Sequence, residues 1–315
     1  MTELDPLAFE VRRASVRGVD LAYLREGEGG FPLVLLHGWP ETMRIWWRNV
    51  RPLADAGFEV IVPDLRGFGE SGLAPDELYD VVSAALDVEA LVRGELGHSA
   101  AVVCGGDFGG VIAQELALRF DGFVVRQVLF NTVPPVGLSD DYAAAGIEAS
   151  RPGRSMASDY FFRQATHADL LAAELDTPDK RRRYVAGMYG HRFWAAPGAF
   201  DQDSVRFMVE PFGDEASFRA SIALYEYALG TREAPEAPLW IASGSAVPTL
   251  VLYGPEDHVI PRAFPRMCEV AFPERIGPFV VEGAGHFLQW ERAEVLNQAV
   301  RFFCLDLLEQ SRAHG

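Results

Sequence analysis

The stretch AVVCGGDFGG, residues 101–110, places an aspartate where chemistry could start. Asp107 follows a short apolar run, with two glycines directly before it and two more shortly after it. A tight strand-to-helix turn needs such small residues, because the backbones approach each other closely there. The turn would raise the carboxylate above the sheet edge, beside a helix N-terminus that favours its ionised form. Such a carboxylate can form a covalent ester as a nucleophile; the alternative is a plain helix N-cap.

Two further residues follow apolar runs in the same way. Asp257 lies shortly after the run TLVLYG, and His286 lies shortly after the run PFVVE. Because the carboxyl ends of parallel strands meet at one edge of a sheet, the three side chains can converge. Asp257 would accept the Nδ1 hydrogen of His286 and fix its tautomer, and His286 would act as the general base. The order along the chain therefore predicts a triad of nucleophile, acid and histidine.

Two other loops are expected at the same edge. The segment HGWP, residues 37–40, ends another apolar run, and the backbone N–H groups of Trp39 and Phe108 would form an oxyanion hole. The segment DLRGFGES, residues 64–71, follows the next run. Its Asp64 is a second candidate for the catalytic acid, but we interpret it as a residue that holds the loop together by hydrogen bonds.

An aspartate nucleophile predicts a particular kind of substrate. Attack by a carboxylate on an sp³ carbon gives an alkyl ester of the enzyme. Water activated by His286 would then attack the carbonyl of that ester, and the oxyanion hole would stabilise the tetrahedral intermediate. The substrate must therefore carry an electrophilic carbon with a leaving group. The two obvious candidates are an epoxide and a carbon–halogen bond.

Eight short apolar runs are expected to be the strands that position these residues. They cover residues 9–16, 19–27, 32–38, 59–67, 100–106, 124–131, 248–254 and 278–286. The first two alternate and predict a hairpin, whereas the continuous runs are typical of strands buried on both faces. Helical patterns lie between strands, and the last predicted helix covers residues 293–310. This alternation predicts an α/β fold with a mostly parallel sheet flanked by helices.

The middle of the chain has a different pattern. Between residues 138 and 245 the glycine-bounded apolar runs stop, and the segments indicate helices. A helical insert between the sixth and seventh strands is best interpreted as a lid over the carboxyl ends of the strands, where ligand sites lie. We therefore expect a core of residues 1–137 and 246–315 and a lid of residues 138–245. The alternative is a separate helical domain with its own role.

The composition limits the partners. A net charge of −17 argues against nucleic acid and anionic membranes, because both bind clustered cations. The three cysteines, Cys104, Cys268 and Cys304, have no CxxC spacing, so neither a disulfide framework nor a metal site is expected. The N-terminal stretch lacks a signal-peptide pattern, and no apolar run reaches the roughly 20 residues that span a bilayer. A cytoplasmic protein is therefore expected.

Together these motifs resemble the α/β-hydrolase-fold epoxide hydrolases, which share an Asp nucleophile with the haloalkane dehalogenases. The matching stretches, in family order, are HGWPETMRIWWR, PDLRGFGES, GGDFGG, YGPEDHVIP and GHFLQW, and the likeness covers nearly the whole chain. The resemblance implies Asp107 as the nucleophile, His286 as the base and Asp257 as its partner. It also implies Trp39 and Phe108 as the backbone donors of the oxyanion hole. No metal or organic cofactor is expected, because the sequence has no ligand cluster and no phosphate-cradling glycine loop with its acidic partner.

The resemblance further implies an acid that protonates the epoxide oxygen, supplied by two lid tyrosines. The segment FRASIALYEYALG aligns with the family segment that carries the second of them, at Tyr225. Tyr227 would face another direction on a helix, because it lies two residues later. The first donor is expected at Tyr160, in SDYFFRQATH, with His167 as the alternative.

The expected substrate is a small hydrophobic epoxide, because the predicted lid is rich in Phe, Met, Trp and Ala. We expect the side chains of Trp39, Phe108 and Phe287 to contact it. Water is the second reactant. The chain could form a homodimer, although no motif encodes an oligomeric state.

Two positions depart from the family pattern. Such epoxide hydrolases usually carry a histidine before the nucleophile and a tryptophan after it, where this chain has Gly106 and Phe108. Haloalkane dehalogenases, the second candidate, normally hold the leaving halide with an indole N–H at the later position, which the Phe108 ring lacks. Fluoroacetate dehalogenases carry an arginine there. A third candidate, a non-catalytic ligand-binding protein on a hydrolase scaffold, is disfavoured because a binding protein needs no such set of reactive residues.

Overall fold

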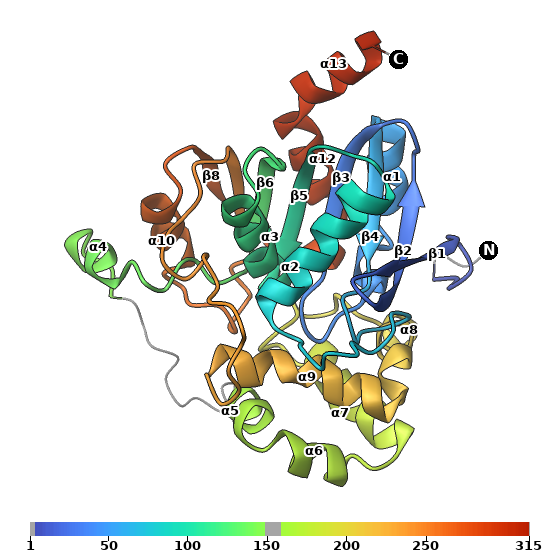
Figure 1. The fold of residues 1–315 in the computed structure, drawn as a ribbon. Coiled ribbons are helices and arrows are strands. Elements are labelled where there is room, and N and C mark those ends of the chain that lie inside the picture. Colours follow the sequence, from blue (N-terminus) through green and yellow to red (C-terminus); the bar gives the residue numbers. More distant parts are fainter. Residues whose placement is uncertain (1–3, 149–158, 315) are drawn as a thin grey trace.

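The computed structural model describes residues 4–148 and 159–314, and its centre is one eight-stranded sheet (Figure 1). The strand order is β1-β2-β4-β3-β5-β6-β7-β8. The pairs β1–β2 and β2–β4 are antiparallel, and the other neighbours are parallel. The strands are β1 Val11–Val16, β2 Val19–Glu26, β3 Phe31–Leu36, β4 Phe58–Pro63, β5 Ala101–Gly106, β6 Val124–Phe130, β7 Thr249–Tyr253 and β8 Arg275–Val280. The predicted sheet is confirmed.

The central strands are buried because helices cover both faces of the sheet. Every residue of β4 and β5 is buried. Helices α2 (Val81–Glu89) and α3 (Asp107–Arg119) lie in front of the sheet in Figure 1, and α2 continues into a π-helical turn, η2 (Ala90–Glu95). Helix α12 (Ala293–Phe303) lies behind the sheet, in contact with α1 (Val50–Ala56). Strands in such a layer need continuous apolar sequence, which is the pattern that predicts them.

The predicted bounds of the last strand are wrong. β8 begins at Arg275 and ends at Val280, so Gly277 and Pro278 lie inside the strand and not at its start. It is an edge strand, and an edge strand tolerates proline because its outer side forms no ladder. Its Ile276 and Phe279 are about half exposed, so it also lacks the pattern of a strand buried on both faces.

The predicted helix over residues 293–310 is also wrong, because the chain forms two helices there. Helix α12 ends at Phe303, and α13 (Leu305–His314) projects from the body at the top of Figure 1. Arg126 on β6 donates to the carbonyl of Phe303 and pairs with Asp306. A side chain of the sheet therefore satisfies a carbonyl group that a continuous helix would use for its own next turn.

Helices of the predicted lid gather at the bottom of Figure 1, at the carboxyl ends of the strands. They are α5 (Asp159–Thr166), α6 (Ala168–Glu174), α7 (Pro178–Gly190), α8 (Gln202–Val209), the short η3 (Glu210–Gly213) and α9 (Glu215–Ala228). Helix α4 (Ser139–Ala144) belongs to the same insert but packs on α10 (Phe264–Ala271), where Tyr142 and Met267 share a small apolar cluster. The ends of the insert are joined where Gly137 N–H donates to the Ile241 carbonyl. The boundaries at residues 138 and 245 stay a prediction.

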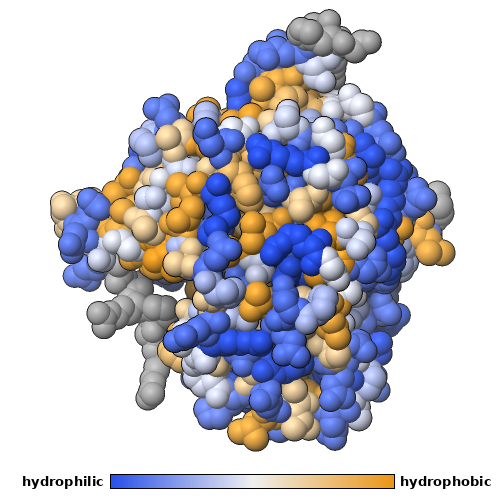
Figure 2. Space-filling model, viewed as in Figure 1, coloured by the Kyte–Doolittle hydropathy of each residue, from blue (hydrophilic) through white to orange (hydrophobic). Residues whose placement is uncertain are grey.

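The surface is mixed in character. Figure 2 shows hydrophilic side chains over much of the lid and the right-hand side, and apolar ones gathered toward the left. The exposed apolar residues include Ile276, Phe279 and Val280 on the edge strand β8. Among the described residues, no helix combines the length and the apolar character that crossing a membrane requires.

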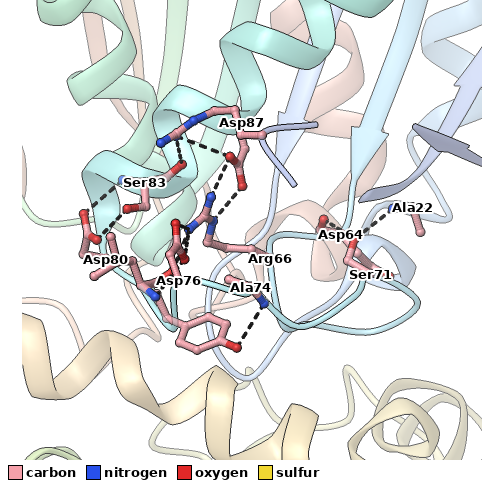
Figure 3. A network of polar contacts seen from close by, with 12 residues as sticks. Ala22, Asp64, Arg66, Ser71, Ala74, Asp76, Asp80, Ser83 and Asp87 are labelled. Atoms are coloured by element: carbon pink, nitrogen blue, oxygen red, sulfur yellow. Dashed lines mark hydrogen bonds and ion pairs between the residues drawn. The ribbon is translucent and has the colours of Figure 1, made fainter. Parts of the chain in front are cut away.

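Asp64 holds the loop that follows β4, as predicted. Its carboxylate accepts hydrogen bonds from the backbone N–H groups of Met43, at 2.6 Å, and Glu70, at 2.8 Å. The carbonyl of the same residue accepts from the Ser71 hydroxyl, which in turn accepts from Ala22 N–H (Figure 3). Asp64 therefore ties the loop to the segment after β3 and to β2.

A buried ion pair fixes the rest of this loop (Figure 3). The guanidinium of Arg66 donates to both carboxylate oxygens of Asp87 on α2, at 2.6 and 2.7 Å, and to the carbonyl of Leu78. The two charged side chains are 2% and 3% exposed. The loop supports the lid, because a Cβ atom on Gly67 would lie 2.8 Å from the Cβ of Ala220 on α9. Arg66 also pairs with Asp76, which is 40% exposed, and Asp87 with Arg17, so the buried Arg66–Asp87 pair is the centre of a small network that holds the loop to α2.

Replacing Asp87 by Asn should lower the free energy of unfolding by about 3 kcal/mol, because the buried guanidinium of Arg66 loses its buried charged partner and keeps only the more exposed Asp76. Urea denaturation followed by circular dichroism would measure the change. Asp20→Asn is the matched control, since the Asp20–Arg13 pair is 57% and 47% exposed and contributes little. Equal stability of the two variants would contradict the importance of the Arg66–Asp87 pair.

Candidate active site

Asp107 stands at the turn between β5 and α3. Its φ angle of 46° lies in the left-handed region, so the strained position of the turn is the aspartate itself and not a glycine. The glycines serve close packing: a Cβ on Gly109 would lie 2.2 Å from the carbonyl oxygen of Leu36, and one on Gly105 would lie 2.4 Å from the carbonyl carbon of Gly109. The turn therefore presents an Asp107 side chain that is 14% exposed.

His286 and Asp257 lie beside Asp107, each in the loop that follows its strand. His286 Nδ1 donates to Asp257 Oδ2 at 3.0 Å, and His286 Nε2 lies 3.5 Å from Asp107 Oδ2. The other oxygen of Asp257 accepts from the N–H groups of Val259, at 2.7 Å, and Ile260, at 3.2 Å. One nitrogen of the imidazole is thus fixed by a fully buried acid, and the other faces the carboxylate of Asp107.

Electrostatics favour the protonated form of His286. Burial alone would lower its pKa, but the charges and hydrogen bonds of Asp257 and Asp107 outweigh burial and raise the pKa well above its ordinary value. The imidazolium therefore neutralises part of the charge of two neighbouring carboxylates. Loss of either negative charge would weaken its hold on the proton.

One backbone donor is bound to an oxygen of Asp107, and the place of Phe108 as a second donor stays a prediction. The N–H of Trp39, just after β3, donates to Asp107 Oδ1 at 3.0 Å. Phe108 is the second residue of α3, and the first N–H groups of a helix have no partner within it. Gly38 needs to be glycine, because a Cβ there would lie 2.5 Å from Asp107 Oδ1. This arrangement can stabilise negative charge on that oxygen.

Two lid tyrosines come close to the nucleophile. Tyr160 is on α5 and Tyr225 on α9, with ring centroids 5.9 Å apart, and the Trp39 ring stacks on the first at 5.9 Å and meets the second edge-on at 5.4 Å. Tyr160 as a whole is partly exposed, but its hydroxyl lies deep. Burial raises the pKa of both tyrosines well above its ordinary value, and the charge of Asp107 adds to the rise. Both hydroxyls therefore retain protons to donate.

The two candidates for the first proton donor lie in different surroundings. His167 is exposed at the N-terminus of α6, and its Nδ1 lies 2.7 Å from the Thr166 hydroxyl. Tyr160 contacts the rings of Trp39 and Trp194. The geometry therefore favours Tyr160 over His167 as a group that can reach the nucleophile.

Phe108 and Phe287 occupy different positions. The ring of Phe108 meets the Tyr225 ring edge-on at 5.1 Å and is partly exposed, so it lies between nucleophile and lid. Phe287 is fully buried, stacks on Tyr189 at 4.6 Å and meets the His286 ring at 5.2 Å. It supports the histidine from the side, and its contact with a substrate stays a prediction.

Sequence reasoning missed Asn131, the residue that joins the loops of the site. Asp107 N–H donates to its carbonyl at 2.9 Å. Its side chain accepts from Gly254 N–H at 2.9 Å and donates to the carbonyls of Gly285, at 2.6 Å, and His286, at 3.3 Å. The segments that follow β5, β7 and β8 are therefore all bonded to one residue at the end of β6, the first through its backbone carbonyl and the other two through its side-chain amide. The one feature of the sequence that points to Asn131 is its position as a polar residue directly after the apolar run of β6.

Glu41 is a second residue that the sequence did not single out. Its carboxylate, 2% exposed, accepts from Gly38 N–H and from the Gln289 amide, both at 2.7 Å. Burial raises the pKa of Glu41 to about 7, although the Gly38 hydrogen bond and the positive charge of His286 limit the rise. The residue holds the segment that carries Trp39 against the segment after His286.

The sheet order, the lid and the triad geometry agree with one class of protein. The family model described as alpha/beta hydrolase fold matches residues 32–293. The chain therefore belongs to the α/β-hydrolase family, and the residue at the turn after β5 is an aspartate.

Similar proteins show which group of α/β hydrolases this chain belongs to. The soluble epoxide hydrolase of Corynebacterium sp. (strain C12) is 31% identical over 297 residues, which are 92% of this chain and 96% of that protein. The chain therefore belongs to the epoxide hydrolases of the α/β-hydrolase family. A haloalkane dehalogenase of Bradyrhizobium diazoefficiens is 35% identical over only 138 residues, 44% of each protein. The solved structure of the epoxide hydrolase CorEH without ligand shares the fold, with a TM-score of 0.80, 22% identity and coverage of 95% and 99% of the two chains.

Replacing Asp107 by Asn should lower the pKa of His286, because the variant loses the negative charge that faces Nε2. A raised folded-state pKa contributes stability that is fully present below the ordinary value of about 6.5 and is lost as the pH rises through the folded-state value. As the pH rises from about 6.5 through the folded-state pKa of His286, the free energy of unfolding should therefore fall more in the wild type than in the variant. NMR titration of the imidazole nitrogens would test this, and an identical pKa in both proteins would contradict the coupling.

Proposed function

We propose that this protein hydrolyses an epoxide to a vicinal diol through a covalent ester of Asp107. The observation that carries the proposal is the surroundings of one carboxylate. A backbone N–H lies on Oδ1, an imidazole lies beside Oδ2, and the charge of the carboxylate acts on two tyrosine hydroxyls of the lid. Membership of the epoxide-hydrolase family supports the same reaction.

In the first step, Oδ2 of Asp107 attacks a ring carbon of the epoxide, because Oδ1 is held by Trp39 N–H. The new C–O bond forms as the ring C–O bond breaks. The departing oxygen takes a proton from Tyr160 or Tyr225, since an alkoxide is a poor leaving group. The product of this step is an alkyl ester with a free hydroxyl on the neighbouring carbon.

The second step begins with a change of charge. Esterification removes the negative charge of Asp107, which helps to hold the proton on His286. The pKa of His286 then falls, the imidazolium gives its proton to the tyrosinate left by the first step, and the neutral imidazole can take a proton from water. The hydroxide attacks the ester carbonyl, and Trp39 and Phe108 N–H stabilise the oxyanion. Collapse releases the diol oxygen, which takes the proton from His286, and the remaining acid proton of Asp107 passes to the imidazole and restores the resting imidazolium and carboxylate.

The proposed substrate is a small hydrophobic epoxide. Aromatic rings surround the nucleophile: Phe108 and Phe161 meet Tyr225 edge-on at 5.1 and 4.9 Å, and Trp194 lies 4.7 Å from Tyr160. Such rings favour apolar groups, and the two hydroxyls supply the polar contact that the epoxide oxygen needs.

Dehalogenation of an alkyl halide is the second candidate, favoured only by the partial match to a haloalkane dehalogenase. A leaving halide needs N–H donors near the nucleophile. Phe108 has none in its side chain, and the indole N–H of Trp39 donates to the Ser221 hydroxyl of the lid at 3.4 Å. Tyrosine hydroxyls suit an epoxide oxygen better. A non-catalytic binding role would leave the buried charges of the triad without a purpose.

The proposal also covers the cellular location of the protein and its partners. A cytoplasmic location fits three buried free cysteines, which a reducing compartment keeps as thiols. The net charge of −17 disfavours nucleic-acid partners. The exposed apolar residues of the edge strand β8 offer a surface for a homodimer.

Replacing His286 by Gln should trap the ester, because Asp107 can still attack while water is no longer activated. Incubation with a small aryl epoxide followed by mass spectrometry of peptides should show an adduct on Asp107. Wild-type protein should form the diol, and Asp107→Ala should form neither adduct nor diol. Loss of activity without an adduct would show that His286 is needed before the attack.

Replacing Tyr225 by Phe should slow ester formation about tenfold or more, because one of two proton donors is lost. Tyr227→Phe is the matched control: it lies on the same helix, but its ring lies beneath the Arg232 guanidinium. The charges that act most on its hydroxyl are those of Arg232 and Asp80 and not that of Asp107. Single-turnover kinetics would measure both variants. An unchanged rate in Tyr225→Phe would assign the acid to another group.

A further inference from the structure

One segment of the lid is bound directly to the loop of the catalytic histidine. We call residues 193–196 the strap. His286 N–H donates to the carbonyl of Trp194 at 2.6 Å, and the Trp194 ring meets the imidazole edge-on at 5.2 Å. The fit is tight, because a Cβ on Gly285 would lie 2.6 Å from both the carbonyl oxygen of Trp194 and the nitrogen of Ala196. The position of His286 is therefore linked to the position of the strap.

Glu291 accepts hydrogen bonds from both the loop of His286 and the strap. It ends the short helix α11 (Leu288–Glu291) and is 8% exposed. Its Oε2 accepts from Gly285 N–H, at 2.5 Å, and from Ala196 N–H of the strap, at 3.2 Å. Its Oε1 accepts from Phe287 N–H at 3.3 Å. The residues on both sides of His286 and the strap thus share one carboxylate.

The chemistry of the three partners explains why an acid stands here. All three are N–H donors, and an ionised carboxylate is a side chain that offers only acceptors. An amide would have to turn its NH₂ group toward at least one of these donors. Hydrogen bonds from the three N–H groups and the positive charge of His286 also offset the cost of burying the carboxylate.

We propose that Glu291 is a positioning residue that sets His286 for ester hydrolysis by holding the histidine between its own loop and the strap. The inference rests on the proposed function, in which His286 acts as base only in the second step. The groups of the first step, Asp107, Tyr160 and Tyr225, have no hydrogen bond with Glu291 among the described residues. Glu291 should therefore matter more for hydrolysis of the ester than for its formation.

Glu291→Gln tests the proposal by rapid-quench kinetics with a small aryl epoxide. Ester hydrolysis should slow by about tenfold or more, because small displacements of a catalytic group have large effects on rate. Ester formation should change by less than about twofold, so the ester should accumulate. Equal slowing of both steps, or no slowing in a folded variant, would overturn the proposal.

Glu115→Gln is the matched control. Glu115 is fully buried and accepts from the N–H groups of Leu239 and Trp240, at 2.8 and 3.0 Å, so it too holds an end of the insert through backbone N–H groups. Its other oxygen pairs with Arg119. It lies away from His286, so the control should lose stability while the ratio of the two rate constants stays that of the wild type. A changed ratio in this variant would show that any loosened lid gives the effect, and would overturn a specific role for Glu291.

Gly285→Ala provides a second route if Glu291→Gln does not fold. The added Cβ separates the strap from the histidine loop but leaves the Glu291 carboxylate in place. The same selective slowing of ester hydrolysis is expected. Equal rates of hydrolysis in this variant and the wild type would contradict the role of the strap.

A measurement without substrate separates this inference from the proposed function. Glu291→Gln should lower the pKa of His286 in an NMR titration, because a neighbouring negative charge is lost, whereas Glu115→Gln should not. If the wild type forms no diol from any epoxide but this difference is found, the proposed function fails and the link between Glu291 and His286 stands. An unchanged pKa, with unchanged positions of the imidazole signals, would overturn the link itself.

Discussion

The whole site depends on two carboxylates that share one buried imidazole. Asp107 and Asp257 flank His286, and their charges keep a proton on a ring that burial alone would leave neutral. Burying three charges is costly unless their geometry is held closely. The Asn131 amide, the two N–H donors on Asp257 and the glycines under Asp107 provide that geometry. Because the charges balance one another, a covalent change at Asp107 alters the basicity of His286 directly.

Residues that directly follow apolar strands could be predicted from sequence, and the triad consists of such residues. Asn131 also directly follows an apolar strand, but its role could not be assigned from sequence, and neither could those of Glu41 and Glu291. The reason is that each of the three bonds a residue far away in the chain: Asn131 bonds Gly285, Glu41 bonds Gln289 and Glu291 bonds Ala196. The two wrong elements have similar explanations. Gly277 and Pro278 mark a turn in sequence but lie within an edge strand, and a contact from Arg126 divides the last helix. Local pattern determines most elements, and long-range contacts determine their ends.

The departures from the family pattern around the nucleophile have a steric explanation. A Cβ on Gly106 would lie 2.3 Å from the ring of Phe130, so no side chain fits before the nucleophile. Phe108, after it, packs against Tyr225. The indole of Trp39 is engaged with Ser221 of the lid and not with the space above Asp107. In the proposed reaction, Tyr160 and Tyr225 are therefore the side chains that make polar contact with a leaving group.

The hydrogen bond from Trp39 to Oδ1 makes the two oxygens of Asp107 unequal before any substrate arrives. In the proposed reaction only Oδ2 leaves with the product, and an oxygen atom from water replaces it. As long as the carboxylate does not rotate, the next cycle removes that same newly installed atom. One oxygen of the nucleophile is thus renewed at every turnover, while the other keeps the atom that it received when the chain was synthesised.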